Sequence, residues 1–446
     1  MPDTNGFFSW NVRDCGSDMK AIFEGDELTS KQFCVSGITD AEVEAYKKKL
    51  VANGYSLTST TDGKNVKYIS FYGENKRVIL TYELKNGVLK TVIDPHGVTP
   101  DEFSYSVEAA PGESAELYHY GLEHLHKYTP EGVAKGYYAA NGMTCVVKCA
   151  DNSVVIIEGG DATQMIGENG DYALADQFDS FLHQITGIPN GEKIRISCWY
   201  LTHCHDDHQM GFSEFIKRHH EKYELERVLV NVPPEDDPVW LWPVCINNFN
   251  ERVVRLINEK YPHCKHYTPH SGDIVQIADV KMQIMLTFED MVDPITGKTV
   301  IVPLDDVSVF NDTSTVVKMW LGEMTAVITG DITPLASPKL VEMHGESLKT
   351  DIIQAAHHGG NLTVEMYEAA KAKYVFVSMN YKNVIYNKYF QERFSVFSKY
   401  SEKEYYSENY GMTVGLAYRN EKIVEVWSPE KYIDLKKILK AQTDTV

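Results

Sequence analysis

The chain lacks any apolar stretch of about eighteen residues, so we expect no membrane-spanning helix and no membrane partner. The start of the chain, from Met1 to Trp10, lacks a basic region followed by a long apolar run, which argues against a secretory signal. The 8 cysteines are scattered singly, and the spacing of Cys145 and Cys149 matches neither a zinc motif nor a redox motif. We therefore expect reduced thiols and a cytoplasmic location.

Basic residues are comparatively scarce. The 43 Lys and Arg stand against 63 Asp and Glu, which gives a formal net charge of -20. Binding an extended nucleic acid requires clustered cations that neutralise its phosphates, so this balance argues against DNA or RNA as a partner. We expect a small-molecule substrate instead. No residue pattern indicates an oligomeric state.

The chain does contain a dense cluster of metal-ligating side chains, which follows a strand-like run. Residues 203–208 read His-Cys-His-Asp-Asp-His. His203 and His205 point the same way if the two-residue period of the strand continues, and Asp207 and His208 in the following turn reach a neighbouring point. Imidazole and carboxylate ligands favour Zn²⁺ and also admit Mn or Fe. The motif therefore predicts a metal site, and its geometry suits two divalent ions.

This motif resembles the metal-ligand signature of the metallo-β-lactamase superfamily, and three other segments are similar to that superfamily in the same order. A hairpin-like segment ends at Glu158, which stands where the superfamily usually has Asp, and two glycines follow it. A strand-like run and Gly-Asp turn end at Asp331, and a later strand-like run leads to the pair His357-His358. The resemblance covers most of residues 138–428.

The resemblance implies the following ligands: His203 and His205 for the first ion, Asp207 and His208 for the second ion, and Asp331 for both. His357 or His358 would complete the second site. Because neighbours at a strand end face opposite sides, one of them is expected to be a ligand and the other to contact a ligand or the substrate. We also expect Asp207, His357 and His358 to be the catalytic residues.

The first site departs from the common superfamily pattern. Many members place a third histidine for the first ion near residue 311, where this chain has Asn311. The run that begins there, together with the histidine pair, is similar to the hydrolase domain of bacterial DNA-uptake (competence) proteins and to its free-standing relatives, which include choline-phosphate esterases. The DNA-uptake relatives usually carry Asp where this chain has His205. Water, substrate or the Asn311 amide would complete the first site.

The residue pattern also predicts how the chain is divided: a small α+β accessory domain over 1–100, a linker over 101–135 and a hydrolase domain over 136–446. In the first segment, Thr39 or Asp40 begins a helix that runs to Ala52, and three strand-like runs follow. Those runs cover residues 66–72, 77–84 and 88–93.

Strands and helices alternate beyond residue 136, with an amphipathic segment at 211–223, which by itself supports a mixed α/β domain. The superfamily resemblance implies more, namely an α/β fold of the four-layer αββα metallo-β-lactamase type. The histidines His263, His266 and His270 lack ligand spacing to one another, and we expect them at the surface.

The ligand set predicts a binuclear metal-dependent hydrolase that uses a metal-bound hydroxide, because each ion lowers the pKa of bound water. A phosphoester of a small substrate is the leading expectation, since two-metal sites suit in-line displacement. Three other readings stay open. The first is a hydrolase of a carboxylic ester, thioester or lactone. The second is a di-iron redox enzyme, whose relatives usually carry Glu where this chain has His205, and the third is a non-catalytic metal-binding module.

Overall fold

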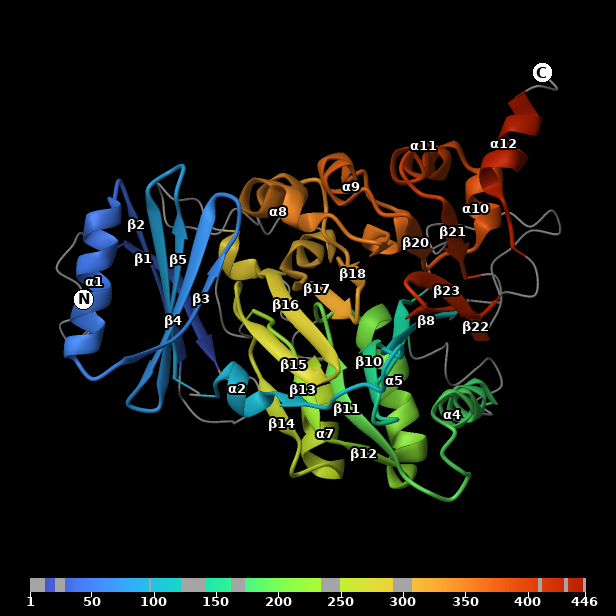
Figure 1. Cartoon of the computed structure of the whole chain (residues 1–446), viewed down its shortest axis with the longest axis horizontal. Coiled ribbons are helices and arrows are strands. Elements are labelled where there is room, and N and C mark those ends of the chain that lie inside the picture. Colours follow the sequence, from blue (N-terminus) through green and yellow to red (C-terminus); the bar gives the residue numbers. More distant parts are fainter. Residues whose placement is uncertain are drawn as a thin grey trace.

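The computed structural model describes residues 13–20, 29–95, 98–121, 142–161, 173–233, 249–291, 307–407, 411–428 and 432–443. These residues form a mixed α/β structure built on three β-sheets, as the sequence predicts for its class (Figure 1). Within the same ranges, no helix combines the length and the apolar character that crossing a bilayer requires.

The first sheet is six-stranded and antiparallel, in the order β1-β2-β6-β5-β4-β3. Its strands are β1 (Arg13–Lys20), β2 (Thr29–Ser36), β3 (Ser56–Asp62), β4 (Val66–Gly73), β5 (Lys76–Glu83) and β6 (Val88–Asp94). The three predicted strands correspond to β4, β5 and β6. The prediction omitted β1, β2 and β3, and β3 is difficult to recognise because Leu57 is its one apolar residue.

Helix α1 (Asp40–Ala52) covers this sheet and begins where its capping residues predict. The Thr39 hydroxyl accepts a hydrogen bond from the Glu42 backbone N–H, and the Glu42 carboxylate accepts one from the Thr39 backbone N–H at 2.8 Å. Its buried face, which includes Val43 and Leu50, packs into a cluster with residues of the sheet.

The two other sheets are larger. One has nine strands, in the order β14-β13-β11-β10-β9-β8-β22-β23 with β12 also paired to β11, and the other has eight, in the order β21-β20-β19-β18-β17-β16-β15-β7. Their strands are β7 (Tyr105–Ser106), β8 (Glu116–Gly121), β9 (Thr144–Lys148), β10 (Val154–Glu158), β11 (Ile194–Tyr200), β12 (Tyr223–Leu225), β13 (Arg227–Leu229), β14 (Lys265–Tyr267), β15 (Ile274–Ala278), β16 (Val280–Leu286), β17 (Val316–Leu321), β18 (Met324–Ile328), β19 (Ile352–Gln354), β20 (Tyr374–Val377), β21 (Lys403–Tyr406), β22 (Gly411–Arg419) and β23 (Lys422–Trp427).

These two sheets pack against each other through alternate residues of their strands. Val155 and Ile157 of β10 share a buried cluster with Val317 and Met319 of β17. The intervening Ile156 belongs to a different cluster, which also contains residues of the helices. The two-residue period of each strand therefore divides its side chains between the space between the sheets and the helix-covered faces.

Helices lie on the outer sides of this pair of sheets. Figure 1 shows α8, α9 and α11 along one side and α4, α5 and α7 along the other. The helices are α2 (Pro100–Phe103), α4 (Ala173–Thr186), α5 (Asp206–His219), α7 (Arg255–Lys260), α8 (Ala336–His344), α9 (Val364–Ala370), α10 (Tyr381–Tyr386), α11 (Lys388–Phe397) and α12 (Leu435–Thr443). Short helical turns complete the described elements: η1 (His220–Lys222), η2 (Asn250–Val254), η3 (Phe288–Asp290), η4 (Val307–Thr313), η5 (Gly345–Leu348) and η6 (Ala356–Gly359).

Part of the segment predicted as a linker contributes strands to the larger sheets. Strand β7 pairs with β15, and strand β8 pairs with β9 and β22. The last part of that segment, 122–135, lies outside the described residues. The division of the chain into domains stays a prediction.

Buried ionic contacts join the six-stranded sheet to the rest of the molecule. Arg77 of β5 and Asp273, each 1% exposed, form an ion pair at 2.6 Å. The ring of His270, which is also 1% exposed, lies 2.9 Å from the Glu289 carboxylate and 3.4 Å from Asp94 of β6. The expectation of a surface position was therefore wrong for His270, because acidic partners from two parts of the fold surround it.

Candidate metal centre

The His-Cys-His-Asp-Asp-His motif spans the connection between β11 and α5. His205 directly precedes α5, and Asp207 and His208 lie in its first turn. The pattern predicts amphipathic character only from residue 211, whereas the helix begins at Asp206. The early positions of α5 carry polar side chains that face other polar side chains, so they do not contribute to an apolar stripe.

The first group of possible ligands consists of His203, His205 and Asp331. Their nitrogen and oxygen atoms lie within 4.8 Å of one another. Nε2 of His203 faces Nδ1 of His205 at 3.0 Å. The other ring nitrogen of His203, Nδ1, lies 2.9 Å from the Thr202 hydroxyl and 3.3 Å from the Ser314 hydroxyl. These two hydroxyls orient the His203 ring so that Nε2 points into the group.

The second group consists of Asp207, His208, Asp331 and His358, again within 4.8 Å. Nε2 of His208 lies 3.2 Å from Oδ2 of Asp331. Nε2 of His358 lies 3.2 Å from Oδ2 of Asp207 and 3.5 Å from Oδ2 of Asp331. Asp331 belongs to both groups, so two ions bound there would share its carboxylate.

The turn that carries His357 and His358 is not a strand end. Strand β19 ends at Gln354, and both histidines adopt left-handed backbone conformations, with φ values of 52° and 55°. The alternation expected for a strand therefore does not apply to them. His358 is buried, whereas the His357 side chain is 36% exposed and its Nε2 lies 3.8 Å from Asp331.

Close backbone contact between α5 and the end of β10 fixes the position of the first helical turn. The Gly211 N–H donates to the Gly160 carbonyl at 2.6 Å. A Cβ atom on Gly211 would lie 2.3 Å from the Gly159 carbonyl oxygen, and a Cβ on Gly159 would lie 2.3 Å from the Cβ of Phe212. Both glycines are therefore required for this approach, which places Asp207 and His208 near the end of β10.

Glu158, at the end of β10, contacts the second group on the side of His208 that faces away from Asp331. It is fully buried and adopts a left-handed backbone conformation with a φ of 60°. Its carboxylate accepts hydrogen bonds from the backbone N–H (3.1 Å) and the hydroxyl of Thr202, and lies 3.3 Å from Nδ1 of His208. Burial raises the pKa of this carboxyl above its usual value, although His208 and Thr202 oppose the shift.

The carboxylates dominate the electrostatics of the second group. Burial disfavours the charged form of His358, but Asp331 and Asp207 outweigh it and raise the pKa of His358 to about 9. Burial likewise disfavours charge on Asp331, but the neighbouring histidines hold its pKa well below the usual value. A buried point with this concentration of carboxylate charge attracts cations.

The donor atoms fit divalent metal ions. Oδ1 of Asp331 is buried and makes no hydrogen bond with the part of the chain that the structure describes, whereas the two ring nitrogens of His208 face carboxylate oxygens of Glu158 and Asp331. A buried carboxylate oxygen without a partner is costly, and imidazole nitrogen and carboxylate oxygen are donors of the kind that Zn, Mn and Fe bind. An ion bound at Asp331 would satisfy this oxygen.

Asn311 lies beside the first group. It is buried, at 2% exposure, and its Oδ1 makes no hydrogen bond with a described residue. Its backbone carbonyl accepts from the N–H of Ser314, whose hydroxyl contacts His203. The neighbouring ring of Phe310 lies 6.1 Å from the ring of His205. Asn311 therefore offers a buried amide oxygen close in the chain to residues that contact His203 and His205.

Solvent reaches the cluster at two of its members. The Asp207 side chain is 38% exposed and the His357 side chain is 36% exposed, whereas His208, Asp331 and His358 are buried. A substrate would therefore approach from the side that Asp207 and His357 share.

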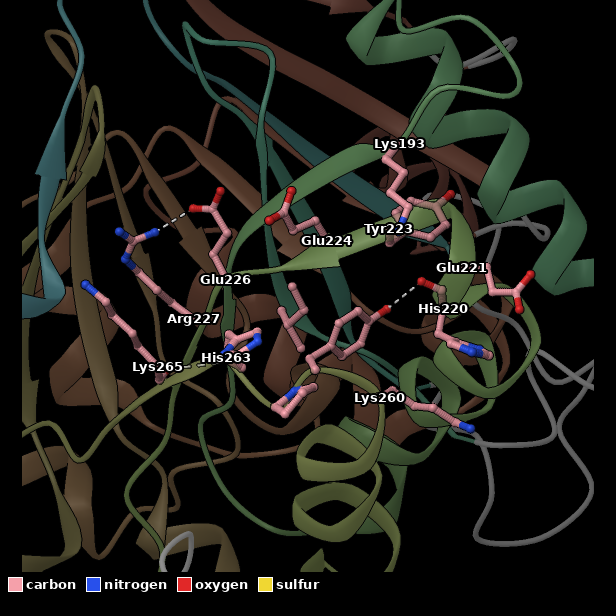
Figure 2. Close-up of a pocket in the computed structure, with 14 residues that line it drawn as sticks. Lys193, His220, Glu221, Tyr223, Glu224, Glu226, Arg227, Lys260, His263 and Lys265 are labelled. Carbon is pink, nitrogen blue, oxygen red and sulfur yellow. Dashed lines mark hydrogen bonds and ion pairs between the residues drawn. The ribbon is translucent and has the colours of Figure 1, made fainter.

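A separate cavity of about 820 Å³ lies at the opposite end of the strands. Lys193, Arg227 and Lys265, at the amino ends of β11, β13 and β14, contribute to its wall (Figure 2). The metal motif follows the carboxyl end of β11, and a strand of this length places the cavity roughly 20 Å away. Its charges are mixed, and Figure 2 shows Arg227 paired with Glu226, at 2.7 Å. The cavity lining therefore mixes acidic and basic side chains, whereas the histidine cluster consists of metal-ligating side chains.

Neither a protein-family model nor a curated protein matches the chain. Similar solved structures include CmlA, a diiron beta-hydroxylase from Streptomyces venezuelae, with 13% identity and a TM-score of 0.31 over 61% of this chain and 46% of that one. Human tRNase Z, short form, has 9% identity and a TM-score of 0.30 over 66% and 92%. The flavodiiron protein from Giardia intestinalis has 11% identity and a TM-score of 0.25 over 51% and 40%.

The chain thus spans about half the length of the first of these structures.

The structure brings six of the suggested ligands into the two groups, namely His203, His205, Asp207, His208, Asp331 and His358, whereas His357 lies at their exposed edge and belongs to neither. It also adds supporting residues. Thr202 and Ser314 contact His203, and their hydroxyls carry no pattern that distinguishes them from other Ser and Thr. Arg393 of α11, which no motif indicated, donates to the carbonyl of Gly360 directly after the histidine turn, and so does the Tyr389 hydroxyl.

Proposed function

We propose that this protein is a binuclear metal-dependent hydrolase of the metallo-β-lactamase superfamily, and that it cleaves a phosphoester of a small substrate. The observation that carries the proposal is the pair of ligand groups that share Asp331. A shared carboxylate between two histidine-containing groups holds two ions close together, which is the arrangement that two-metal hydrolysis requires. The two packed sheets with helices on their outer sides support the four-layer αββα fold of that superfamily.

In this proposal, His203 and His205 hold the first ion, Asp207, His208 and His358 hold the second, and Asp331 bridges them. When bound, such ions would lower the pKa of a coordinated water and polarise the oxygen of the scissile bond. We favour Zn, with Mn or Fe as alternatives, because the donors are imidazole nitrogen and carboxylate oxygen.

The remaining residues position and orient these ligands. Thr202 and Ser314 hold the ring of His203, and Glu158 faces His208 from the side away from Asp331. His357, which is partly exposed, lies at the entrance and is placed to contact the substrate or the leaving group. Its exposure distinguishes it from His358, which is buried within the second group.

The substrate class follows from charge and access. The net charge of -20 disfavours a long polyanion, whereas a small ester can reach the cluster between Asp207 and His357. The similarity to DNA-uptake hydrolase domains and to choline-phosphate esterases, seen in the residue pattern, supports phosphoester chemistry. We place the protein in the cytoplasm, since its cysteines are scattered singly and the following six are buried free thiols: Cys34, Cys145, Cys149, Cys198, Cys204 and Cys264.

The test is hydrolysis of bis(p-nitrophenyl) phosphate by protein reloaded with Zn²⁺ or Mn²⁺. We expect metal-dependent turnover that Asp207→Ala abolishes, whereas Asp176→Ala, a half-exposed aspartate on α4, retains it. Absence of turnover with either ion would refute phosphoester hydrolysis as the reaction. p-Nitrophenyl acetate and a thioester, assayed alongside, identify carbonyl esters as the alternative, and iron loading that produces visible absorption without hydrolysis would favour redox chemistry.

A further inference from the structure

Two side chains of α11 meet at one carbonyl oxygen beside the metal centre. Nε of Arg393 donates to the Gly360 carbonyl at 2.7 Å, and the Tyr389 hydroxyl donates to the same oxygen at 3.0 Å. The Arg393 guanidinium also lies over the Tyr389 ring, 3.2 Å from its centroid, and donates to the Tyr389 carbonyl at 2.9 Å. Arg393 and Tyr389 thus form one unit, here called the α11 clamp.

The clamp holds the end of a strained turn. His357 and His358 are consecutive non-glycine residues with left-handed φ values of 52° and 55°, and Gly359 follows at 89°. Side chains with a Cβ rarely adopt this conformation, and they retain it only where the surrounding contacts determine it. The turn therefore depends on the groups that fix its two ends.

Backbone contacts secure the amino-terminal end of the turn. The Ala356 N–H donates to the Tyr367 hydroxyl at 3.0 Å, and the His357 N–H donates to the Gly330 carbonyl at 3.1 Å. At the other end, the Gly360 N–H donates to the His357 carbonyl at 2.6 Å. The Gly360 carbonyl then receives both donors of the clamp, so α11 determines how the carboxyl-terminal end of the turn is oriented.

The position of His358 within the second ligand group depends on this turn. Its ring is buried, and its Nε2 lies 3.2 Å from Asp207 and 3.5 Å from Asp331. A change in the backbone at Gly359 or Gly360 would move this ring relative to the carboxylates. Displacements of this kind at residues that support ligands typically weaken metal binding by about 10- to 100-fold.

We propose that Arg393 and Tyr389 are positioning residues for the second metal site, which hold residues 356–360 in the conformation that presents His358 to Asp207 and Asp331. The inference relies on the proposed function for the presence of the ions, but not for the reaction. It also assigns a role to α11 (Lys388–Phe397), which contributes no ligand of its own.

The experiment measures Zn²⁺ affinity by competition with a chromophoric chelator, and the visible absorption of the Co²⁺-loaded protein, in full-length variants. For Arg393→Gln we expect Zn²⁺ affinity at the second metal site to fall by about 10-fold, and the Co²⁺ spectrum to change. Tyr389→Phe should lose less, because the donor to Gly360 that remains is then the charged and closer one, Nε of Arg393 at 2.7 Å. Arg393→Lys should recover part of the loss, since an ammonium group can also donate to a carbonyl.

Tyr386→Phe is the matched control. Tyr386 lies on α10 and is 53% exposed, against 49% for Tyr389, and we expect its variant to bind Zn²⁺ like the native protein. Zn²⁺ affinity within twofold of native in both Arg393→Gln and Tyr389→Phe would overturn the proposal. A raised KM with native metal affinity would also overturn it, because that result assigns Arg393 to the substrate.

The experiments can refute the positioning role of the α11 clamp and the hydrolase proposal separately. If the clamp variants weaken Zn²⁺ binding while no substrate is hydrolysed by the native protein, the positioning role stands and the hydrolase proposal fails. If native protein hydrolyses the phosphodiester and the clamp variants bind Zn²⁺ normally, the positioning role fails alone. Tyr389→Phe removes only one hydroxyl from a half-exposed side chain, so it keeps the test available if Arg393→Gln does not fold.

Discussion

Glu158 combines two features that are unfavourable by themselves, a buried carboxylate and a left-handed backbone. Residues with such conformations cluster at functional sites, where other contacts hold them in place. Here those contacts are the backbone N–H and hydroxyl of Thr202, and the carboxylate in turn faces Nδ1 of His208. We therefore interpret Glu158 as the residue that orients the ring of His208 through its Nδ1 atom.

Replacing Glu158 by Gln tests this role. The amide retains an oxygen that can accept from Thr202, but it removes the negative charge that faces His208. We expect Zn²⁺ affinity to fall by about 10-fold, with a much smaller change in thermal stability. Glu226→Gln, a partly buried carboxylate at the other end of the same sheet, should leave Zn²⁺ affinity unchanged. Equal affinities for native protein and Glu158→Gln would contradict the assignment.

At this scale the sequence indicates candidate ligands more readily than the residues that support them. Histidine and aspartate are rare enough, and clustered enough at 203–208, to be recognised as ligands. The sequence does not reveal the contact between Arg393 and Gly360, because 33 positions separate them and an arginine in a helix is ordinary. Only the folded arrangement of α11 shows it.

Helix α5 depends on the absence of a side chain at Gly211. A Cβ there would lie 2.3 Å from the Gly159 carbonyl oxygen and 2.8 Å from that of Asp161, so an added methyl must displace backbone. We expect Gly211→Ala to lower the free energy of unfolding by about 3 kcal/mol, and to weaken metal binding because Asp207 and His208 move with the helix.

Urea denaturation with and without Zn²⁺ measures both effects of Gly211→Ala. Ser213→Ala, two residues along the same helix, is the control. Its hydroxyl donates to the Gln209 carbonyl at 2.8 Å within α5, so its loss should cost only about 1 kcal/mol. If Gly211→Ala is as stable as the native protein, the close approach between α5 and the end of β10 is not required.

The elements that the sequence predicts are those with clear local signals. Helix α1 has its capping box, and β4, β5 and β6 are rich in apolar and aromatic residues. The start of α5 lacks such a signal because its first turn is polar and carries the candidate ligands Asp207 and His208, and β3 lacks one because it is polar throughout except for Leu57. Periodicity detects burial against an apolar core, and neither segment is stabilised in that way.

For the whole molecule, buried ion pairs determine how the six-stranded sheet is attached. Arg77 and Asp273 are each 1% exposed, whereas Lys85 and Glu342, which also join this sheet to the rest, are 68% and 34% exposed. Replacing Arg77 by Met leaves a buried aspartate without its cation, and we expect a loss of about 3–5 kcal/mol in unfolding free energy. Lys85→Met should cost less than about 1 kcal/mol. Similar losses in the two variants, measured by urea denaturation, would refute this account of the attachment.

The same interface predicts a pH dependence. Burial and Arg77 disfavour charge on His270, but Glu289 and Asp94 outweigh them and raise its pKa to about 10, against 6.5 in the unfolded chain. A raised pKa in the folded state stabilises the protein fully below pH 6.5, and this contribution is lost as the pH rises through about 10. His270→Gln should therefore show a smaller decline in unfolding free energy between pH 7 and 10 than the native protein. Parallel declines in both proteins would contradict the assignment.

In the proposed centre one shared carboxylate, Asp331, joins two metal sites, and metal stoichiometry tests this arrangement most directly. Protein reloaded with Zn²⁺ and freed of excess ions should retain two equivalents by elemental analysis. The double variant His203→Ala, His205→Ala should retain one, because the ligands Asp207, His208, Asp331 and His358 remain. Asp331→Ala should retain neither ion tightly. Native protein that holds no Zn²⁺, or an Asp331→Ala variant that holds two equivalents, would contradict the account.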